Sequence, residues 1–209
     1  MADSPYKSIT ISRLMGSGGS YIGYLAAKEL GFKYLDREIL YEASTYLGMD
    51  SGALEQQEGK SSGIIKNIIR MFSFGTPEAY VPPVRTSVYD KDLFQLECKI
   101  MNRIADQYSA VIVGRGGFYA LKDRPEVIHV FIHAPLEFRI KRVMEARKIA
   151  DYGKIRSMVV ESDLSKAKFI KDIIGVNWTD SNNFHLCIDS SAVDFHSVLE
   201  IIMKFLKKI

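Results

Sequence analysis

Two short apolar runs most constrain the fold that this chain can adopt. One run, AVIV, spans residues 110–113, and the other, VIHVFI, spans residues 127–132. Runs this continuous are typical of strands buried on both faces of a sheet. Strand-like patterns recur at residues 7–12, 32–35 and 184–189, with helical segments between the five. This alternation predicts an α/β fold in which a parallel sheet of about five strands carries helices on both faces.

The expected helices lie between these strands. Apolar residues at helical spacing occur at residues 21–30, 93–105 and 193–206. From Pro135 the chain is expected to be helical to about Lys171, and the first part of that segment is strongly basic. The stretch 39–106 also reads as mainly helical, but serine, glycine and proline clusters interrupt it, which indicates an inserted helical subdomain.

Composition excludes several classes of protein. With 28 Lys and Arg against 25 Asp and Glu, the net charge of +3 is too small to indicate a nucleic-acid or membrane-surface binder. Two cysteines, Cys98 and Cys187, cannot form a disulfide framework or a cysteine-rich metal site. Neither a signal peptide nor a membrane-spanning run is recognisable, so a cytoplasmic location is expected. His129 and His133 lack carboxylates or cysteines at ligand spacing and are expected to be structural.

A glycine cluster, GSGG at residues 16–19, lies between the first expected strand and helix. Glycines in this position let backbone N–H groups converge on an anion at a helix N-terminus, although many glycine turns have no ligand. The standard phosphate loop is G-x-x-x-x-G-K-[ST]. Aligned on Gly18, this chain has Ser20 at the hydroxyl position but Gly19 in place of the lysine and Arg13 in place of the first glycine. Arg13 is either the substitute cation or a solvated arginine at a strand end.

Four blocks of the sequence, in order, resemble the cytidylate kinase-like family, a branch of the P-loop nucleoside monophosphate kinases that lacks the loop lysine. They are residues 9–40, VIVGRGG at 111–117, HVFIHAPLEFRIKRV at 129–143, and NWTDSNNFHLCIDSS at 177–191. The resemblance implies a single P-loop kinase domain over residues 1–209. Its core would be about 1–40, 92–138 and 184–209, with a helical acceptor-binding insert at about 41–91 and a mobile helical lid at about 139–183.

The resemblance also implies roles for individual residues. Those that match the family's phosphate loop are Gly16, Ser17, Gly18, Gly19 and Ser20, with Ser20 touching a magnesium ion. Those expected to bind the acceptor are Asp36, Arg37 and Arg115, and the lid contributes Asp163 and Lys166. In the family Arg115 is followed by an aspartate and position 166 is an arginine, so Gly116 and Lys166 are departures. Arg139 and Arg142 share a face of the basic helix and are expected to reach the donor, unless they belong to a solvated basic surface.

Together these features predict an ATP- and magnesium-dependent phosphotransferase acting on a nucleoside monophosphate, with a cytidylate-like acceptor favoured. Its partners would be small nucleotides, with no nucleic acid or membrane. Arg13, Arg139, Arg142 and Lys166 would neutralise the transferring phosphoryl group. Two alternatives stay open: a catalytically weak or inactive nucleotide-binding protein on a kinase scaffold, suggested by Gly19 and Gly116, and a kinase for a metabolite other than a nucleotide.

Overall fold

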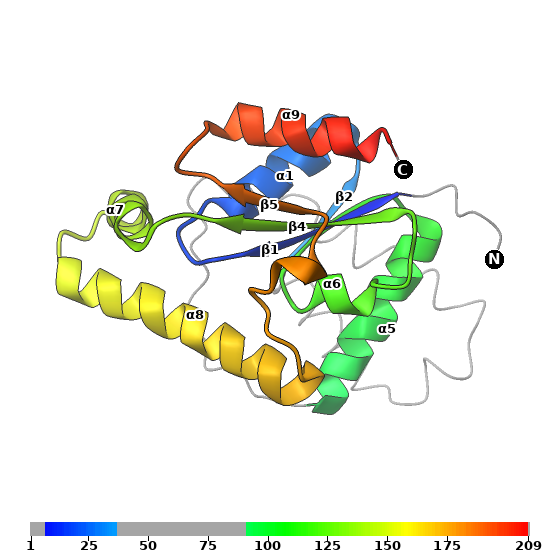
Figure 1. The fold of residues 1–209 in the computed structure, drawn as a ribbon, viewed down its shortest axis with the longest axis horizontal. Coiled ribbons are helices and arrows are strands. Elements are labelled where there is room, and N and C mark those ends of the chain that lie inside the picture. Colours follow the sequence, from blue (N-terminus) through cyan, green and yellow to red (C-terminus); the bar gives the residue numbers. More distant parts are fainter. Residues whose placement is uncertain (1–6, 37–90, 209) are drawn as a thin grey trace.

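The computed structural model describes residues 7–36 and 91–208, and its centre is a five-stranded parallel sheet (Figure 1). The strands are β1 (Ser8–Arg13), β2 (Lys33–Leu35), β3 (Ala110–Val113), β4 (Val127–His133) and β5 (Leu186–Asp189). Their spatial order is β2-β3-β1-β4-β5, and every neighbouring pair is parallel. The parallel sheet predicted from the sequence is confirmed.

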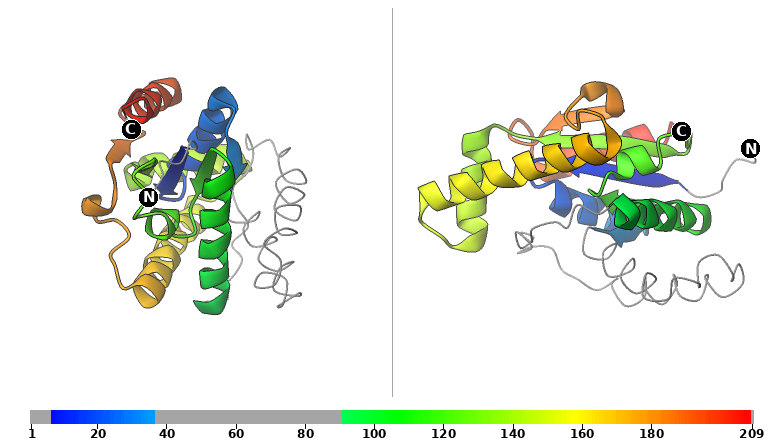
Figure 2. Two further views of the ribbon diagram at one scale, coloured as in Figure 1. Left: turned by 90° about the vertical axis from the view of Figure 1, so that its right-hand side faces the viewer. Right: turned by 90° about the horizontal axis from the view of Figure 1, so that it is seen from below.

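Helices cover both faces of this sheet (Figures 1 and 2). On one face lie α1 (Gly19–Leu30) and α9 (Phe195–Leu206). On the other face lie α5 (Lys91–Gln107), the short α6 (Gly117–Ala120) and the long α8 (Tyr152–Ile174). Between β4 and α8, α7 (Leu136–Arg147) sits at the edge of the sheet where the strands end and packs against α8. Loops that follow β1, β3, β4 and β5 therefore meet at this edge.

Alternation along β1 divides the core between the two faces of the sheet. Ile9 and Ile11 are buried against α1 and α9, together with Ile22 and Val198. Successive strand residues point to opposite faces, so the remaining β1 side chains point away from this cluster. The opposite face holds an aromatic cluster contributed by α5, α6, β4, α8 and the segment after α8. It consists of Phe94, Phe118, Phe131, Phe169 and Trp178, with Ile170.

His129 is held inside the sheet, as its alternation with apolar residues predicted. Its Nδ1 atom is 2.7 Å from the hydroxyl of Thr10 on the neighbouring strand, and its ring stacks on His185. Burial lowers the pKa of His129 to about 4, because the charged form of the imidazole is disfavoured away from water. His129 is therefore a neutral structural residue at physiological pH.

The structure differs from the sequence-based expectations mainly in short elements. The four-residue α6 and a 3-10 helix, η2 (Ser181–Asn183), were not predicted. The last helix begins at Phe195 rather than Val193. The Asp194 carboxylate caps it by accepting hydrogen bonds from the backbone N–H groups of His196 and Ser197. The expected insert at about 41–91 lies outside the described residues, except for Lys91. The division into core, insert and lid stays a prediction.

In the two described segments, no helix is long and apolar enough to cross a membrane.

Candidate phosphate-binding site

The glycine loop turns the chain sharply from β1 into α1. Gly16 and Gly18 have φ angles of 83° and 84°, in the left-handed region that glycine tolerates best. A Cβ atom on Gly16 would lie 2.6 Å from the carbonyl oxygen of Arg139, so the loop and α7 are in direct backbone contact. Gly18 is the N-cap of α1 and has no side chain with which to cap the helix. The first N–H groups of α1 can therefore serve an anion.

Ser17 holds the loop in this shape. Its side chain is fully buried, and its hydroxyl donates to the carbonyl oxygens of Leu14 and Ile132 at 2.9 and 3.2 Å. The Ser17 carbonyl accepts a 2.6 Å hydrogen bond from Ser190, just after β5. Ser17 was expected to bind phosphate, but its backbone N–H donates to the Leu14 carbonyl oxygen at 3.2 Å and its hydroxyl also fixes the loop. Ser190 was not singled out in the sequence, where Ser190-Ser191 reads as an ordinary polar turn.

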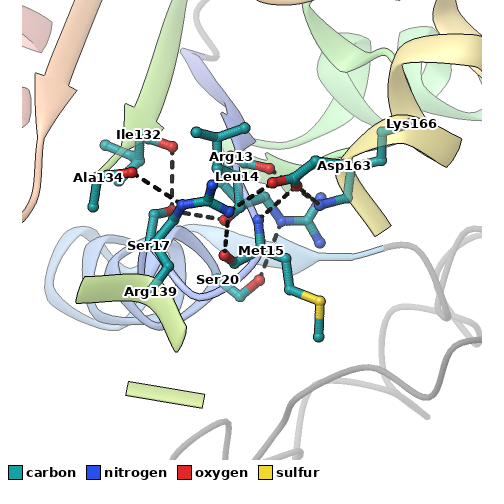
Figure 3. Close-up of polar contacts among 10 residues, drawn as sticks. All are labelled: Arg13, Leu14, Met15, Ser17, Ser20, Ile132, Ala134, Arg139, Asp163 and Lys166. Carbon is teal, nitrogen blue, oxygen red and sulfur yellow. Dashed lines mark hydrogen bonds and ion pairs between the residues drawn. The ribbon is translucent and has the colours of Figure 1, made fainter. Parts of the chain in front are cut away.

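The Arg13 side chain points along the loop toward the start of α1 (Figure 3). Its Nε donates to the Ser20 hydroxyl at 3.3 Å. Two glycines leave space for it, because a Cβ atom on Gly114 would collide with the Arg13 guanidinium and one on Gly19 would collide with its stem. The guanidinium therefore lies beside the hydroxyl that the phosphate-loop pattern assigns to the metal.

Gly19 and Arg13 also exclude each other sterically. A Cβ atom on Gly19 would be 2.6 Å from the Arg13 Cβ and 3.1 Å from its Cγ. Real Cβ atoms do not approach this closely, so only one of the two positions can carry a side chain in this backbone. In the standard phosphate loop the first position is glycine and the seventh is lysine. Here the side chain and the glycine have exchanged places.

Asp163 connects α8 to the loop and to α7 (Figure 3). Its Oδ1 accepts a 2.9 Å hydrogen bond from the backbone N–H of Met15 and lies 3.3 Å from Lys166 Nζ. Its Oδ2 forms a 2.6 Å ion pair with Arg139 Nη1. Arg139 is itself buried and donates to the carbonyl oxygens of Ala134 and Met15 at 3.0 and 2.9 Å.

Lys166 lies on the same side of the loop as Asp163. Its Nζ is 3.4 Å from the Arg13 carbonyl oxygen and 5.6 Å from the centre of the Trp178 ring. Burial lowers the pKa of Lys166 to about 8, and the nearby Arg13 charge is the second cause. Asp163 acts in the opposite direction and raises this pKa. Positive charge is thus concentrated at this point beyond what one carboxylate balances.

Arg142 reaches the other side of the loop. Its guanidinium lies over the ring of Phe195 with 4.3 Å between the guanidinium carbon and the ring centre. A Cβ atom on Gly18 would be 3.1 Å from the same carbon and 2.8 Å from the Phe195 ring. Arg139 and Arg142, expected to act from one helix face, both contact the loop but from different directions. Phe195 was not singled out in the sequence, because it reads as one apolar residue of an amphipathic helix.

Arg115 is placed differently from these cations. Two of its guanidinium nitrogens contact the same oxygen of Glu97, Nε at 2.7 Å and Nη2 at 2.5 Å. Glu97 is completely buried on α5. The Arg115 guanidinium also lies 5.0 Å from the centre of the Phe169 ring on α8. Arg115 therefore ties β3, α5 and α8 together, and an acceptor would share it with Glu97.

The remaining acceptor candidates are at the end of β2. Asp36 directly follows β2, at the same edge of the sheet as the glycine loop. Tyr34 of β2 places its hydroxyl 3.5 Å from the Ser20 carbonyl oxygen, which connects this strand to the loop. Arg37 lies outside the described residues.

The residues present suit a metal held mainly by phosphates. Among the described residues, no group of three or more His, Cys, Asp or Glu side chains could hold a metal ion. Magnesium in kinases is held by few protein ligands together with substrate phosphates. The Ser20 hydroxyl, at the N-terminus of α1 beside the loop backbone, fits the role of such a protein ligand.

Comparison with known proteins places these contacts in a family context. Residues 8–192 match the model of the cytidylate kinase-like family. A cytidylate kinase from Methanosarcina acetivorans is 24% identical over 194 residues, which cover 93% of each chain. A cytidylate kinase from Saccharolobus islandicus is 22% identical over 202 residues, covering 96% of this chain and 91% of the relative.

Solved structures show the same fold. A crystal structure of an uncharacterized protein from Eubacterium ventriosum matches with a TM-score of 0.71 and 21% identity, covering 97% of this chain and 99% of that one. A gluconokinase from Sinorhizobium meliloti matches with a TM-score of 0.54 and 14% identity, covering 99% and 94%. At these identities the likeness concerns the fold alone.

Proposed function

The chain belongs to the cytidylate kinase-like family and has the fold of P-loop kinases, and on that premise we propose that it transfers the γ-phosphoryl group of ATP to a nucleoside monophosphate. A cytidylate-like acceptor is favoured, since the curated relatives named above are cytidylate kinases.

The convergence of cations on the glycine loop carries this proposal. Arg13 from β1, Arg139 and Arg142 from α7, and Lys166 from α8 all contact the loop or its immediate supports. They come from three separate parts of the chain, so a merely basic surface does not explain their meeting. Phosphoryl transfer depends mainly on positioning and on neutralising charge, and clustered cations supply both.

The residues would divide the work by position. Backbone N–H groups of residues 16 and 18–20 would donate to the donor phosphates, while the Ser17 N–H is used within the loop. Arg13, Arg139 and Lys166 would neutralise the group in transfer, and Arg142 would bind the donor. In the reaction the bond between the γ-phosphorus and its bridging oxygen breaks, and a bond to an oxygen of the acceptor phosphate forms. ADP and a nucleoside diphosphate leave, and no protein nucleophile is needed.

Magnesium would be held by Ser20 and the donor phosphates, and it would supply further neutralisation of phosphate charge. Ser20 then has a second contribution, because its hydroxyl accepts a hydrogen bond from Arg13 and fixes that guanidinium beside the phosphates.

The acceptor would lie between β2 and β3, where Asp36 follows one strand and Arg115 the other. Arg37 is proposed as a further acceptor ligand from its family position. Arg115 would contact the acceptor phosphate while Glu97 keeps its guanidinium in place.

A coupled assay of ADP release tests this function directly. The protein is incubated with ATP, magnesium and a panel of acceptors that includes the common nucleoside monophosphates and gluconate. We expect turnover with at least one pyrimidine monophosphate. Turnover only with a sugar or another metabolite would move the function to a non-nucleotide kinase, and absence of turnover with every acceptor would refute the phosphotransferase proposal.

A nucleotide-binding protein without useful catalysis is the second candidate. It is favoured by the Arg115–Glu97 pair, since a completely buried carboxylate competes with the acceptor for this guanidinium. Calorimetry separates the two: binding of ATP with no turnover supports the binder, and fast turnover rejects it.

The pH dependence of the reaction should report Lys166. Its pKa of about 8 in the free protein means that the ammonium is charged below pH 8 and becomes neutral above it. We therefore expect kcat/KM for ATP to decrease above about pH 8, because this parameter follows ionisations of the free enzyme. Lys166→Arg keeps its charge and should extend the plateau toward higher pH. An identical alkaline decrease in both proteins would assign the ionisation to another group.

A further inference from the structure

The carboxylate of Asp163 lies where the charges proposed to act on the transferring phosphoryl group converge. It accepts from a backbone N–H of the glycine loop at 2.9 Å, from Arg139 at 2.6 Å and from Lys166 at 3.3 Å. Charged donors on two sides and a loop N–H on a third are the partners that phosphate oxygens take in proteins.

The charge balance around this carboxylate favours an anion with more charge than one aspartate. Arg139 and Lys166 both contact this single carboxylate, and the charges of Arg13 and Arg139 add to burial in lowering the pKa of Lys166. Clustered cations of this kind repel each other unless an anion compensates them. The terminal phosphoryl group of a triphosphate carries more negative charge than one carboxylate. It would therefore compensate these cations more fully than Asp163 does.

The connection between lid and loop runs through the same side chain. Asp163 belongs to α8, and its partners are Met15 of the loop and Arg139 of α7 (Figure 3). A purely structural ion pair with Arg139 would not require the loop N–H. By accepting from that N–H, Asp163 joins α8 to the start of the loop, directly before Gly16, and occupies a backbone donor there.

We propose that Asp163 occupies the place of the terminal phosphoryl group when no triphosphate is bound, and thereby sets the discrimination of the site between triphosphate and diphosphate nucleotides. This inference rests on the proposed function. ATP must displace the carboxylate from Met15, Arg139 and Lys166, whereas ADP lacks the group that competes and leaves Asp163 in place. Asp163 is thus a specificity-determining residue that weakens ATP binding relative to ADP, because its carboxylate competes with the terminal phosphoryl group for the same donors.

Asp163→Asn tests the proposal, because the amide keeps an oxygen for the Met15 N–H and loses the negative charge. We expect the Kd for ATP with magnesium, measured by calorimetry, to decrease about tenfold, and the Kd for ADP to change less than about threefold. A tenfold change corresponds to about 1.4 kcal/mol.

Asp172→Asn is the matched control. Asp172 lies on the same helix in an exposed pair with Lys168, so this variant removes the same charge without touching the loop, and both affinities should stay at the wild-type values.

Each outcome bears on a different claim. Equal gains for ATP and ADP, or weaker ATP binding in Asp163→Asn, would overturn the role of Asp163 and leave the proposed function standing. Failure of the wild-type protein to bind either nucleotide would overturn both.

The wild-type protein offers a second measurement that does not depend on a variant folding. Trp178 is the one tryptophan of the chain, and it lies under Lys166, next to the Asp163 cluster. Displacement of Asp163 should change the surroundings of Trp178, so ATP should shift its fluorescence and ADP should not. The same shift with both nucleotides would contradict the proposal.

Discussion

Replacing Arg13 by glycine is expected to lower kcat about 10³-fold while the protein stays folded. A single well-placed arginine contributes about 10³–10⁵ to the rate of phosphoryl transfer in related chemistry. Arg13 is the cation that lies along the loop beside Ser20, at 3.3 Å from its hydroxyl. Arg156, an exposed residue of α8, provides the control, because Arg156→Ala removes the same charge away from the loop and should leave kcat unchanged. Turnover and ATP affinity are measured together.

Adding lysine at position 19 should restore activity only when position 13 is glycine. Arg13→Gly with Gly19→Lys recreates the order G-x-x-x-x-G-K-S, and we expect kcat within about tenfold of wild type, since a lysine then reaches the phosphates from the usual position. Gly19→Lys alone should be nearly inactive, because its Cβ would be 2.6 Å from the Arg13 Cβ.

Arg13→Ala combined with Gly19→Lys separates charge from sterics. Alanine at position 13 keeps the Cβ that collides with residue 19, so this double variant carries the lysine and should not recover. Recovery equal to that of the glycine version would show that the two positions do not exclude each other. A double-mutant cycle on kcat then gives the coupling between the positions, which independent sites would not show.

The fold was predictable because its signals are local. Continuous apolar runs identified β3 and β4, and the helical spacing that ends before Gly31 identified α1, whose last turn Gly31 closes with a left-handed φ of 67°. The short α6 carries too few residues to show any period. The complete burial of Glu97 could not be foreseen either, since a single acidic residue in an amphipathic helix normally faces solvent.

The sequence could indicate the candidate site only as a set of residues. The loop pattern identified Arg13 as a candidate cation, and the family resemblance brought Asp163 and Lys166 into the set. The contact of Asp163 with the Met15 N–H joins residues 148 positions apart, which no local pattern encodes. The steric exclusion between Arg13 and Gly19 arises from the short distance between their backbones. That distance depends on how the chain passes from β1 into α1, and the sequence pattern shows only that glycines are present there.

Arg139→Met is expected to lower the free energy of unfolding by about 3 kcal/mol. Removing one partner of a buried ion pair costs about 3–5 kcal/mol, because the other charge stays buried without compensation. Arg139 is buried and holds three acceptors, from Ala134, Met15 and Asp163, so methionine leaves all three short of a donor. The lower end of the range applies because Lys166 remains beside Asp163. Urea unfolding of both proteins measures the difference.

Lys168→Met is the matched control for this loss. Lys168 forms a 2.6 Å pair with Asp172 on the exposed side of α8, and exposed pairs of this spacing contribute about 0.5 kcal/mol or less. Equal destabilisation by both variants would mean that the Arg139 contacts do not fasten the loop.

Arg139→Met combined with Asp163→Asn should recover part of the lost stability, since removal of both charges leaves no uncompensated carboxylate. That recovery would come with weaker ATP binding than in Asp163→Asn alone, because the cation that Asp163 holds in place is the one that the triphosphate needs.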